Sequence, residues 1–477
     1  QGSALLTDPR NDENLVISQF QLAFVKLHNR AVDYVRSGAG HDLLGDNGVY
    51  ETARRLVRWH YQWLVLHEFL PKTCDAAVLD DLAANGRSYF LQPDSPVSIP
   101  VEFAGAAYRY GHSQIRDRYT VNDDATDVQF FPGPAPESVE TLADAMAGDG
   151  GPPPGVVEEM TDQNLNGFEP VPEELVIDWS YFFDHDPEAA ESTAQPGRPI
   201  DTAMPPALML LPFISHGPKS LATRNLLRGK ALGLPSGQAV AEKMGIDSLD
   251  NDEIPLPGGQ SYADYLRSSH RGAETEAPLW LYVLGEAAVQ EDGHRLGAVG
   301  SRIVGEVIRG MVDADDRAFV NEDPDWTPTL PRPVSAGVDD RYRIADLLRF
   351  ATGPAPDGLE IAAIDGDGSG PAPDTPESDR TNGEAVLLEH TGAGPLDLGG
   401  YRIDYEEQTE TLDSLDEPVE PGERVVVYTG SGPASTADID ARVVTLDRGG
   451  AVLEDEGESV VVHTPTGELS ACGEFGG

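Results

Sequence analysis

The sequence predicts a large, mainly helical domain followed by a small all-β domain. Before Thr352, apolar residues recur at helical intervals in long stretches. After Thr352, a linker rich in Gly, Pro and Asp leads into short β-branched runs separated by turn residues. A chain of 477 residues is long enough for one large domain and a smaller one. We therefore place the two domains at residues 1–352 and 353–477.

The charge balance is strongly acidic. The chain has 82 Asp and Glu against 33 Lys and Arg, a formal net charge of -49, and its acidic residues are spread over the whole length. Such a surface repels phosphates, so nucleic acid and anionic membranes are excluded as partners. The pattern resembles that of proteins from salt-loving organisms, and an ordinary acidic secreted protein is the alternative.

Neither cysteines nor apolar runs indicate a special scaffold. The two cysteines, Cys74 and Cys472, lie too far apart in the sequence to predict a disulfide framework or a cysteine metal cluster. No run of 18 or more apolar residues predicts a membrane-spanning helix. The opening "QGSALLTDPR" has no methionine and no signal-peptide pattern, so we expect the chain to start within a longer protein.

Helices are expected in order along the first domain. Residues 15–36 space their apolar residues helically, as do residues 51–71, where Pro71 is expected to end the helix. Ser98 and Pro100 predict the start of a further helix that carries Ala104, Ala107, Tyr108 and His112 along one side. Residues 122–174 are rich in Pro, Gly and acidic residues and are expected to form a mobile insertion. Helical patterns resume at residues 220–234, 235–245, 277–290, 296–312 and 344–351.

The last 125 or so residues read as a β domain. Alternating segments such as "EAVLLEH", "YRIDY" and "ERVVVYTG" predict an antiparallel sandwich or barrel. The stretch "NGEAVLLEHTGAGPLDLGGYRID", with "EPGERVVVYTGSG" after it, resembles a lamin-tail domain, an immunoglobulin-like sandwich. That resemblance implies an accessory or binding unit with a surface or protein partner.

One histidine raises the question of function. By spacing alone, His112 in "AYRYGHS" is more typical of a hydrogen-bonded core histidine than of a ligand. The stretch, however, resembles the proximal-histidine motif of the animal haem peroxidases. Other stretches match that family in the same order, namely "DPRNDEN", "HNR", "ARRLVRWHYQWLVLHEFLP" and "RNLLRGKALGLPSGQAV". The bacterial branch is most similar, through "IDWSYFFD", "PLWLYVLGEA" and "NEDPDWTPTLP", and the resemblance covers residues 1 to about 352.

The resemblance implies haem b as the cofactor. It implies that His112 is the axial iron ligand and that Asn225 accepts a hydrogen bond from the other ring nitrogen. Arg109 and Arg228 match the positions that bind the haem propionates, and a helix-surface arginine is the alternative for Arg228. Arg109 also stands where cyclooxygenases have a radical-forming tyrosine, which favours peroxidase chemistry over fatty-acid oxygenation.

On the distal side, the resemblance implies roles for two residues. Arg10 is permanently charged and would stabilise negative charge on the departing peroxide oxygen, with a surface ion pair to Asp8 or Asp12 as the alternative. Glu13 lies one helical step further and matches a residue that forms an ester with a haem methyl group. Asn14 stands where some members of the family attach haem through a methionine sulfonium, which rules out that bond.

A distal histidine, the base for the peroxide proton, is also implied, in an Asp-His-Asp motif that contributes to a calcium site. In the family this motif lies upstream of the arginine segment, so we expect it, and any calcium, before Gln1, and we expect the chain as given to be inactive alone. His185 in "FFDHD" follows His112 and is expected to be a loop residue. His60 and His67 lie seven residues apart with no Cys or carboxylate set to complete a metal site, and they are expected to be packing or polar-face residues.

The sequence therefore predicts a haem peroxidase that uses hydrogen peroxide to oxidise small electron donors or halides. An extracellular or cell-surface location is favoured. The alternative is a non-catalytic haem-binding or scaffold protein in which the β domain supplies adhesion.

Overall fold

The computed structural model describes most of the chain, namely residues 8–36, 48–90, 98–131, 164–168, 170–184, 192–211, 214, 216–272, 275–332, 341–352, 359–365, 385–390, 395–405, 408–415, 417–428, 441–446, 459–465 and 469–474. The chain divides into two compact units. One comprises residues 1–21 and 59–328, and the other comprises residues 22–58 and 329–477. The second unit therefore takes in helical residues as well as the C-terminal strands.

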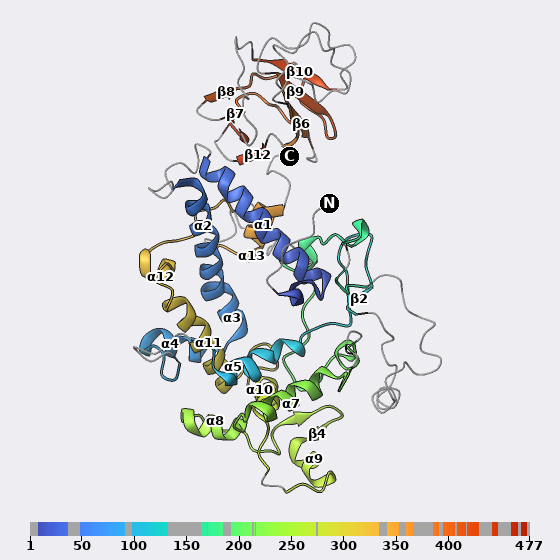
Figure 1. Cartoon of the computed structure of the whole chain (residues 1–477), viewed down its shortest axis with the longest axis vertical. Coiled ribbons are helices and arrows are strands. Elements are labelled where there is room, and N and C mark those ends of the chain that lie inside the picture. Colours follow the sequence, from blue (N-terminus) through green and yellow to red (C-terminus); the bar gives the residue numbers. More distant parts are fainter. Residues whose placement is uncertain are drawn as a thin grey trace, which may run out of the picture. The chain divides into compact units, whose positions relative to one another are not determined.

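The described part of the chain up to Thr352 is mainly helical (Figure 1). Its α-helices are α1 (Leu15–Arg36), α2 (Gly48–Leu64), α3 (Leu70–Thr73), α4 (Ala76–Asn85), α5 (Val101–Gly105), α7 (Leu221–Leu232), α8 (Gly237–Met244), α9 (Tyr262–Ser268), α10 (Leu279–Gln290), α11 (Ala298–Asp313), α12 (Phe319–Glu322) and α13 (Ile344–Thr352). Short helical turns and two-stranded ribbons join them: η1 (Pro9–Asp12), η3 (Val65–Phe69), η4 (Ala107–His112), η5 (Glu173–Leu175), η6 (Trp179–Tyr181), η7 (Pro206–Leu208), β1 (Arg118–Tyr119) with β2 (Val128–Gln129), and β3 (Pro255–Leu256) with β4 (Gln260–Ser261). None of the helices described is both long enough and apolar enough to cross a membrane.

Helix α7 shows why the sequence patterns were informative. The side chain of Ser220 accepts a hydrogen bond from the Thr223 N–H and caps the N-terminus. Gly233 ends the helix at φ 66°, a left-handed conformation that favours glycine. The helices predicted at residues 15–36, 220–234, 235–245, 277–290, 296–312 and 344–351 are all confirmed.

The sequence predicted that Pro71 ends the helix before it, and that prediction is wrong. Helical structure continues through Thr73, because the five residues Val65–Phe69 form a wider π-helical turn just before α3. Pro71 lies in α3 directly after this turn, and Phe69 before α3 keeps helical angles of φ -64° and ψ -52°. The proline therefore marks a local change of helix type rather than an end.

The stretch that leads to His112 is not one continuous helix, and that prediction is wrong. Helix α5 ends at Gly105, and Ala106, at φ -139° and ψ -76°, leaves the helical conformation before the 3₁₀ turn η4 begins. Gly105 lies so close to α7 that a Cβ there would be 2.7 Å from Leu232 Cδ1. Close packing against the neighbouring helix overrides the local periodicity at this point.

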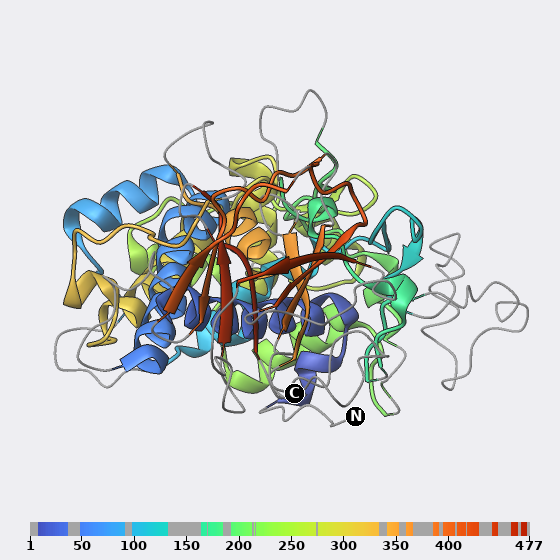
Figure 2. The same ribbon diagram turned by 90° about the horizontal axis from the view of Figure 1, so that it is seen from above.

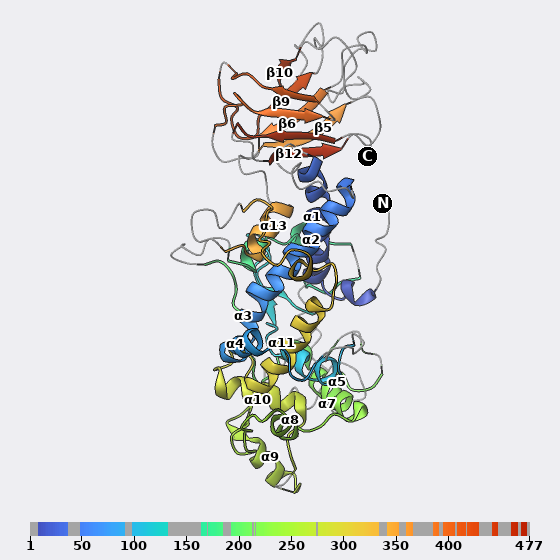
Figure 3. The ribbon, with the colours of Figure 1, turned by 90° about the vertical axis from the view of Figure 1, so that its left-hand side faces the viewer.

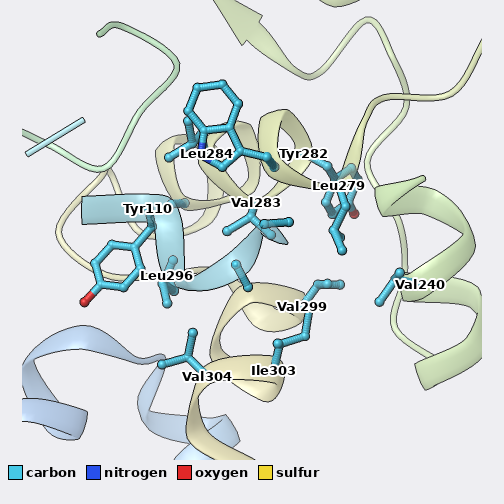
Figure 4. Close-up of a cluster of buried hydrophobic side chains, with 14 of the residues drawn as sticks. Tyr110, Val240, Leu279, Tyr282, Val283, Leu284, Leu296, Val299, Ile303 and Val304 are labelled. Atoms are coloured by element: carbon cyan, nitrogen blue, oxygen red, sulfur yellow. The ribbon is translucent and has the colours of Figure 1, made fainter. Parts of the chain in front are cut away.

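The core of the first unit is formed largely by α10 and α11. Figure 4 shows Val283 of α10 and Val299 of α11 in one cluster of buried side chains, with Tyr110 of η4 beside them. Gly237 approaches this core so closely that a Cβ would lie 1.9 Å from the Tyr282 ring. The Tyr282 hydroxyl in turn accepts a hydrogen bond of 3.0 Å from the Leu249 N–H. The turn η4 thus rests on a densely packed support.

Two buried glutamates tie distant segments to this core. Glu306 accepts hydrogen bonds of 2.8–2.9 Å from the backbone N–H groups of Ser88, Tyr89 and Phe90. Glu286 accepts bonds of 3.0–3.1 Å from Val299 and from Gly300, at the N-terminus of α11. A carboxylate at a helix N-terminus satisfies N–H groups that lack intrahelical partners.

The described strands of the second unit form two four-stranded sheets. One has the order β10 (Arg442–Thr445), β9 (Arg424–Tyr428), β6 (Ala385–His390) and β5 (Leu359–Asp365), and the other the order β12 (Leu469–Glu474), β11 (Ser459–His463), β7 (Arg402–Tyr405) and β8 (Gln408–Thr411). The strands are seen from the side in Figure 3 and from above in Figure 2. Apolar side chains of both sheets, such as Val427 and Val460, share one buried cluster.

The expectation of purely antiparallel pairing is wrong for β9 and β10. These two strands run parallel, with Val443 opposite Val426, while the other pairs in both sheets are antiparallel. Parallel neighbours need a connection of about a dozen residues rather than a tight turn, and residues 429–441 supply that length.

Glu286 should make stability depend on pH. Burial raises the pKa of this carboxyl from 4.5 to about 7, so the folded chain holds a proton there that the unfolded chain releases. The free energy of unfolding should therefore fall as pH rises from about 4.5 to about 7, by at most about 3 kcal/mol. In Glu286→Gln this part of the pH dependence should disappear, measured by urea unfolding at several pH values.

The matched control is Glu242→Gln, which changes an exposed glutamate on α8 and should keep the slope of the parent chain. If Glu286→Gln and Glu242→Gln show the same slope, Glu286 is ionised in the folded chain throughout this range.

Candidate functional site

Arg109 and His112 lie on the same side of η4. A 3₁₀ helix has three residues per turn, so side chains three positions apart are eclipsed. The guanidinium and the imidazole therefore project together toward α7, where both reach Asn225. The departure from α-helical geometry at Ala106 is what sets this turn against α7.

The backbone of η4 is held from two directions. The indole N–H of Trp280 in α10 donates a hydrogen bond of 3.3 Å to the carbonyl of Arg109. The hydroxyl of Ser113 donates one of 2.9 Å to the carbonyl of Tyr110. Tyr110 is itself buried, and burial raises the pKa of its hydroxyl. A side-chain hydrogen bond with Thr73 opposes this rise but does not cancel it. The turn is thus positioned by its neighbours before any ligand binds.

Asn225 connects the two functional side chains of η4. It is 1% exposed, and it is the buried residue of α7, while its neighbours Leu226 and Leu227 are 40% and 49% exposed. Its amide Nδ2 lies 3.0 Å from His112 Nδ1, and its Oδ1 lies 3.3 Å from Arg109 Nη1. The structure thus brings Asn225 to His112 as the resemblance implied, but it presents the amide nitrogen rather than the oxygen.

His112 is neutral at ordinary pH. Burial and then the charge of Arg109 lower the pKa of its imidazole to about 4. A neutral imidazole keeps one nitrogen lone pair, which is what a metal ion requires. Among the described residues, no group of three or more His, Cys, Asp and Glu side chains gathers as a metal site.

Positive charge collects around His112 in a very acidic chain. Burial lowers the pKa of Arg109, and the charges of Arg228 and Arg10 lower it further, so the three guanidinium groups lie within electrostatic range. Arg109 donates to the carbonyl of Ala104 (2.8 Å) and to Asn225. In the described part of the chain, neither Arg109 nor Arg228 forms an ion pair with a carboxylate. The cluster is therefore suited to an anionic ligand.

Arg10 is exposed and bonded to a neighbour. Its guanidinium forms an ion pair with Asp8, the alternative noted from the sequence, and this contact lowers the pKa of Asp8 to about 2. Exposed ion pairs contribute little to stability, so Arg10 is free to exchange Asp8 for another anion. Its charge also contributes to lowering the pKa of Arg109.

The segment from Asn164 to Phe168 holds η1 against the start of α1. The N–H groups of Gly167 and Phe168 donate to the carbonyls of Glu13 and Asp12, at 3.1 Å and 2.8 Å. The Leu15 N–H donates to the carbonyl of Leu165 at 2.9 Å. The expectation of a mobile insertion is therefore wrong for residues 164–168, because paired backbone groups and the buried Leu165 fix them; residues 132–163 lie outside the described part.

Asn14 has a structural role at the same junction. It is 4% exposed, and its Oδ1 accepts a hydrogen bond of 2.9 Å from the Val16 N–H at the start of α1. Glu13 precedes it with a half-buried side chain near Arg10, whose pKa it helps to raise. Asn14, the residue after Glu13, thus caps the N-terminus of α1.

Sequence reasoning missed the residues that support the site. Neither Trp280 nor the carbonyl of Ala104 carries a local signal, since both act through tertiary contacts. The turn residues in "NLNG" were a usable signal for the segment at Asn164. His185 lies outside the described residues. His60 is buried against Trp326, with ring centroids 4.9 Å apart, which confirms its packing role.

Comparison with known proteins connects this site to a family. The family model described as animal haem peroxidase matches residues 2–315. Heme peroxidase 2 of Caenorhabditis elegans is 31% identical over 115 residues, which are 23% of this chain and 16% of that protein. Chorion peroxidase of Drosophila melanogaster is 23% identical over 351 residues, which are 72% of this chain and 38% of that protein. The chain thus spans less than two fifths of the length of either relative.

Gly167 should be essential for holding the Arg10 segment. A Cβ at this position would lie 1.7 Å from the Asp12 carbonyl oxygen, so Gly167→Ala must push the two segments apart. We expect a loss of about 2–3 kcal/mol in the free energy of unfolding, measured with urea. The control Gly229→Ala lies in α7, where the added Cβ meets only Leu234 Cδ1 at 3.6 Å, and should be neutral or stabilising. Equal stabilities of the two variants would contradict the close contact.

Proposed function

Because the chain belongs to the animal haem peroxidase family, we propose that it binds haem b and uses hydrogen peroxide to oxidise small electron donors or halides. The observation that carries the proposal is the neutral imidazole of His112, held by buried Asn225 beside arginines that have no carboxylate partner among the described residues. That donor set fits haem: one axial nitrogen for iron and cations for two propionates.

His112 would hold the iron through Nε2, since Nδ1 is in contact with Asn225. Haem, when bound, supplies the redox chemistry with peroxide. The contribution of His112 and Asn225 is to fix the ring angle and the basicity of the axial nitrogen. The anchoring of η4 by Trp280 supports this role, because it keeps the imidazole in place.

Arg109 and Arg228 would bind the haem propionates. Each guanidinium can bind a carboxylate with two parallel hydrogen bonds, and neither has such a partner in the described residues.

Arg10 and Glu13 would act on the distal side. Arg10 would leave its exposed pairing with Asp8 and stabilise negative charge on the departing peroxide oxygen. Glu13 would form an ester with a haem methyl group, which loses one C–H bond while hydrogen peroxide takes up the two electrons and is reduced to water, and this link would fix the macrocycle. The capping role of Asn14 supports a site without a sulfonium link at the next position.

The second unit and the surface charge carry two further parts of the proposal. The two-sheet part would be an accessory module for a surface or protein partner, and the site of action would be extracellular or at the cell surface. The net charge of -49 supports adaptation to high salt.

The first test concerns the axial ligand. Titration of the full chain with haemin should give a Soret band, and His112→Ala should change that band and weaken binding at least about tenfold, because iron loses its protein nitrogen. The control His294→Ala removes an exposed histidine of the same unit and should leave spectrum and affinity unchanged. An unaltered spectrum in His112→Ala would refute the assignment.

The second test concerns salt. The charge of -49 repels itself over a screening length of about 30 Å at 0.01 M salt, which falls to about 3 Å near 1 M. The melting temperature should therefore rise with sodium chloride into the molar range, measured by circular dichroism. A flat or falling curve would favour an ordinary acidic secreted protein.

A further inference from the structure

The amide of Asn225 has two chemically different ends, and its neighbours determine which end faces which. A guanidinium has only donors, so the atom 3.3 Å from Arg109 Nη1 must be the acceptor Oδ1. The NH₂ end then faces His112, with Nδ2 3.0 Å from Nδ1. Because an amide nitrogen only donates, His112 Nδ1 must accept.

This arrangement leaves His112 in the wrong tautomer for binding iron through Nε2. A neutral imidazole carries one hydrogen, and if Nδ1 accepts a hydrogen bond, that hydrogen is on Nε2. A protonated nitrogen has no lone pair to give. The contacts seen in the structure therefore hold His112 in a form that does not ligate.

We propose that the hydrogen bond from Arg109 holds the Asn225 amide in this orientation, an arrangement that we call the latch. An anionic porphyrin releases it by binding Arg109. This inference rests on the proposed function. When a propionate takes the Arg109 guanidinium, the Asn225 amide turns over and presents Oδ1 to His112. Nδ1 then carries the hydrogen and donates it to Oδ1, while Nε2 releases its proton to solvent and Nδ1 takes one from solvent. The lone pair on Nε2 would then be available to hold the haem iron, and the exchange of protons with solvent involves no change of oxidation state.

The turnover and the release of Arg109 must occur together. If the amide turned while Arg109 stayed, Nδ2 would face a guanidinium, two donors without an acceptor between them. Arg109 is well placed to leave, because its Nε bond to the Ala104 carbonyl does not depend on Asn225. Arg109 is therefore a positioning residue for His112 in addition to a propionate contact.

Haem-free protein tests the tautomer directly. In the full chain labelled with ¹⁵N-histidine, two-bond correlation spectra should show His112 with Nε2 protonated and Nδ1 not, with the signal assigned by its loss in His112→Gln. Arg109→Met, which cannot hydrogen-bond, should shift the population toward protonated Nδ1. Asn225→Asp offers only acceptors and should also give protonated Nδ1. A protonated Nδ1 in the parent chain would overturn the proposal.

Binding tests the latch. Haemin dimethyl ester lacks the propionate charges and cannot draw Arg109 away, so Arg109→Met should bind this ester roughly tenfold more tightly than the parent chain does. The same variant should bind haemin more weakly, because a propionate contact is lost. Arg228→Met is the matched control: it should weaken haemin binding and leave ester binding unchanged.

The tautomer and binding measurements distinguish a failure of the latch from a failure of the proposed function. If Arg109→Met and Arg228→Met both leave ester affinity unchanged, or lower it equally, there is no latch. If His112→Ala binds haemin as the parent chain does, the proposed function itself fails. The tautomer measurement needs no haem, so it judges the latch independently of that result.

Discussion

The first unit depends on burying a few polar side chains and pairing each with groups far away in the sequence. Glu306 holds the N–H groups at residues 88–90, Glu286 holds the start of α11, and Asn225 joins η4 to α7. In a core of low dielectric, an unpaired polar group costs free energy, so each of these contacts admits few alternatives. The helices that carry the site are thereby fixed relative to one another in this unit.

Local signals predicted the helices well and the connections poorly. Apolar periodicity determines α7, α10 and α11, because their hydrogen bonds are internal, and in α7 the capping residues Ser220 and Gly233 lie next to the helix. The break at Ala106 and the parallel pairing of β9 with β10 follow from contacts with distant segments, as does the ordered segment at Asn164. No window of sequence contains those partners, so periodicity could not predict them.

The order of motifs in the sequence identified residues that lie together in the structure, but it could not predict which atoms of these residues are in contact. His112, Arg109 and Asn225 form one hydrogen-bonded cluster; the resemblance implied the contact of Asn225 with His112 but not the one with Arg109. Which end of an amide faces an imidazole depends on a third group, here a guanidinium, and a motif does not encode that choice. The ion pair of Arg10 with Asp8, by contrast, joins neighbours in sequence, and the sequence offered it as an alternative.

The unequal pairing of the arginines explains how the cluster is prepared for an anion. Arg10 rests in an exposed ion pair that is easily exchanged, whereas Arg109 is partly buried, repelled by Arg228 and Arg10, and bonded only to neutral oxygens in the described residues. In a chain of net charge -49, leaving such a group without a carboxylate is unfavourable unless a ligand supplies one. Asn225 meets that need while the ligand is absent: its oxygen satisfies Arg109 and its nitrogen satisfies His112, so the protein folds with both groups paired. Under our proposal, an anion that binds Arg109 would remove the reason for that orientation, and the lone pair of Nε2 would become available to a metal.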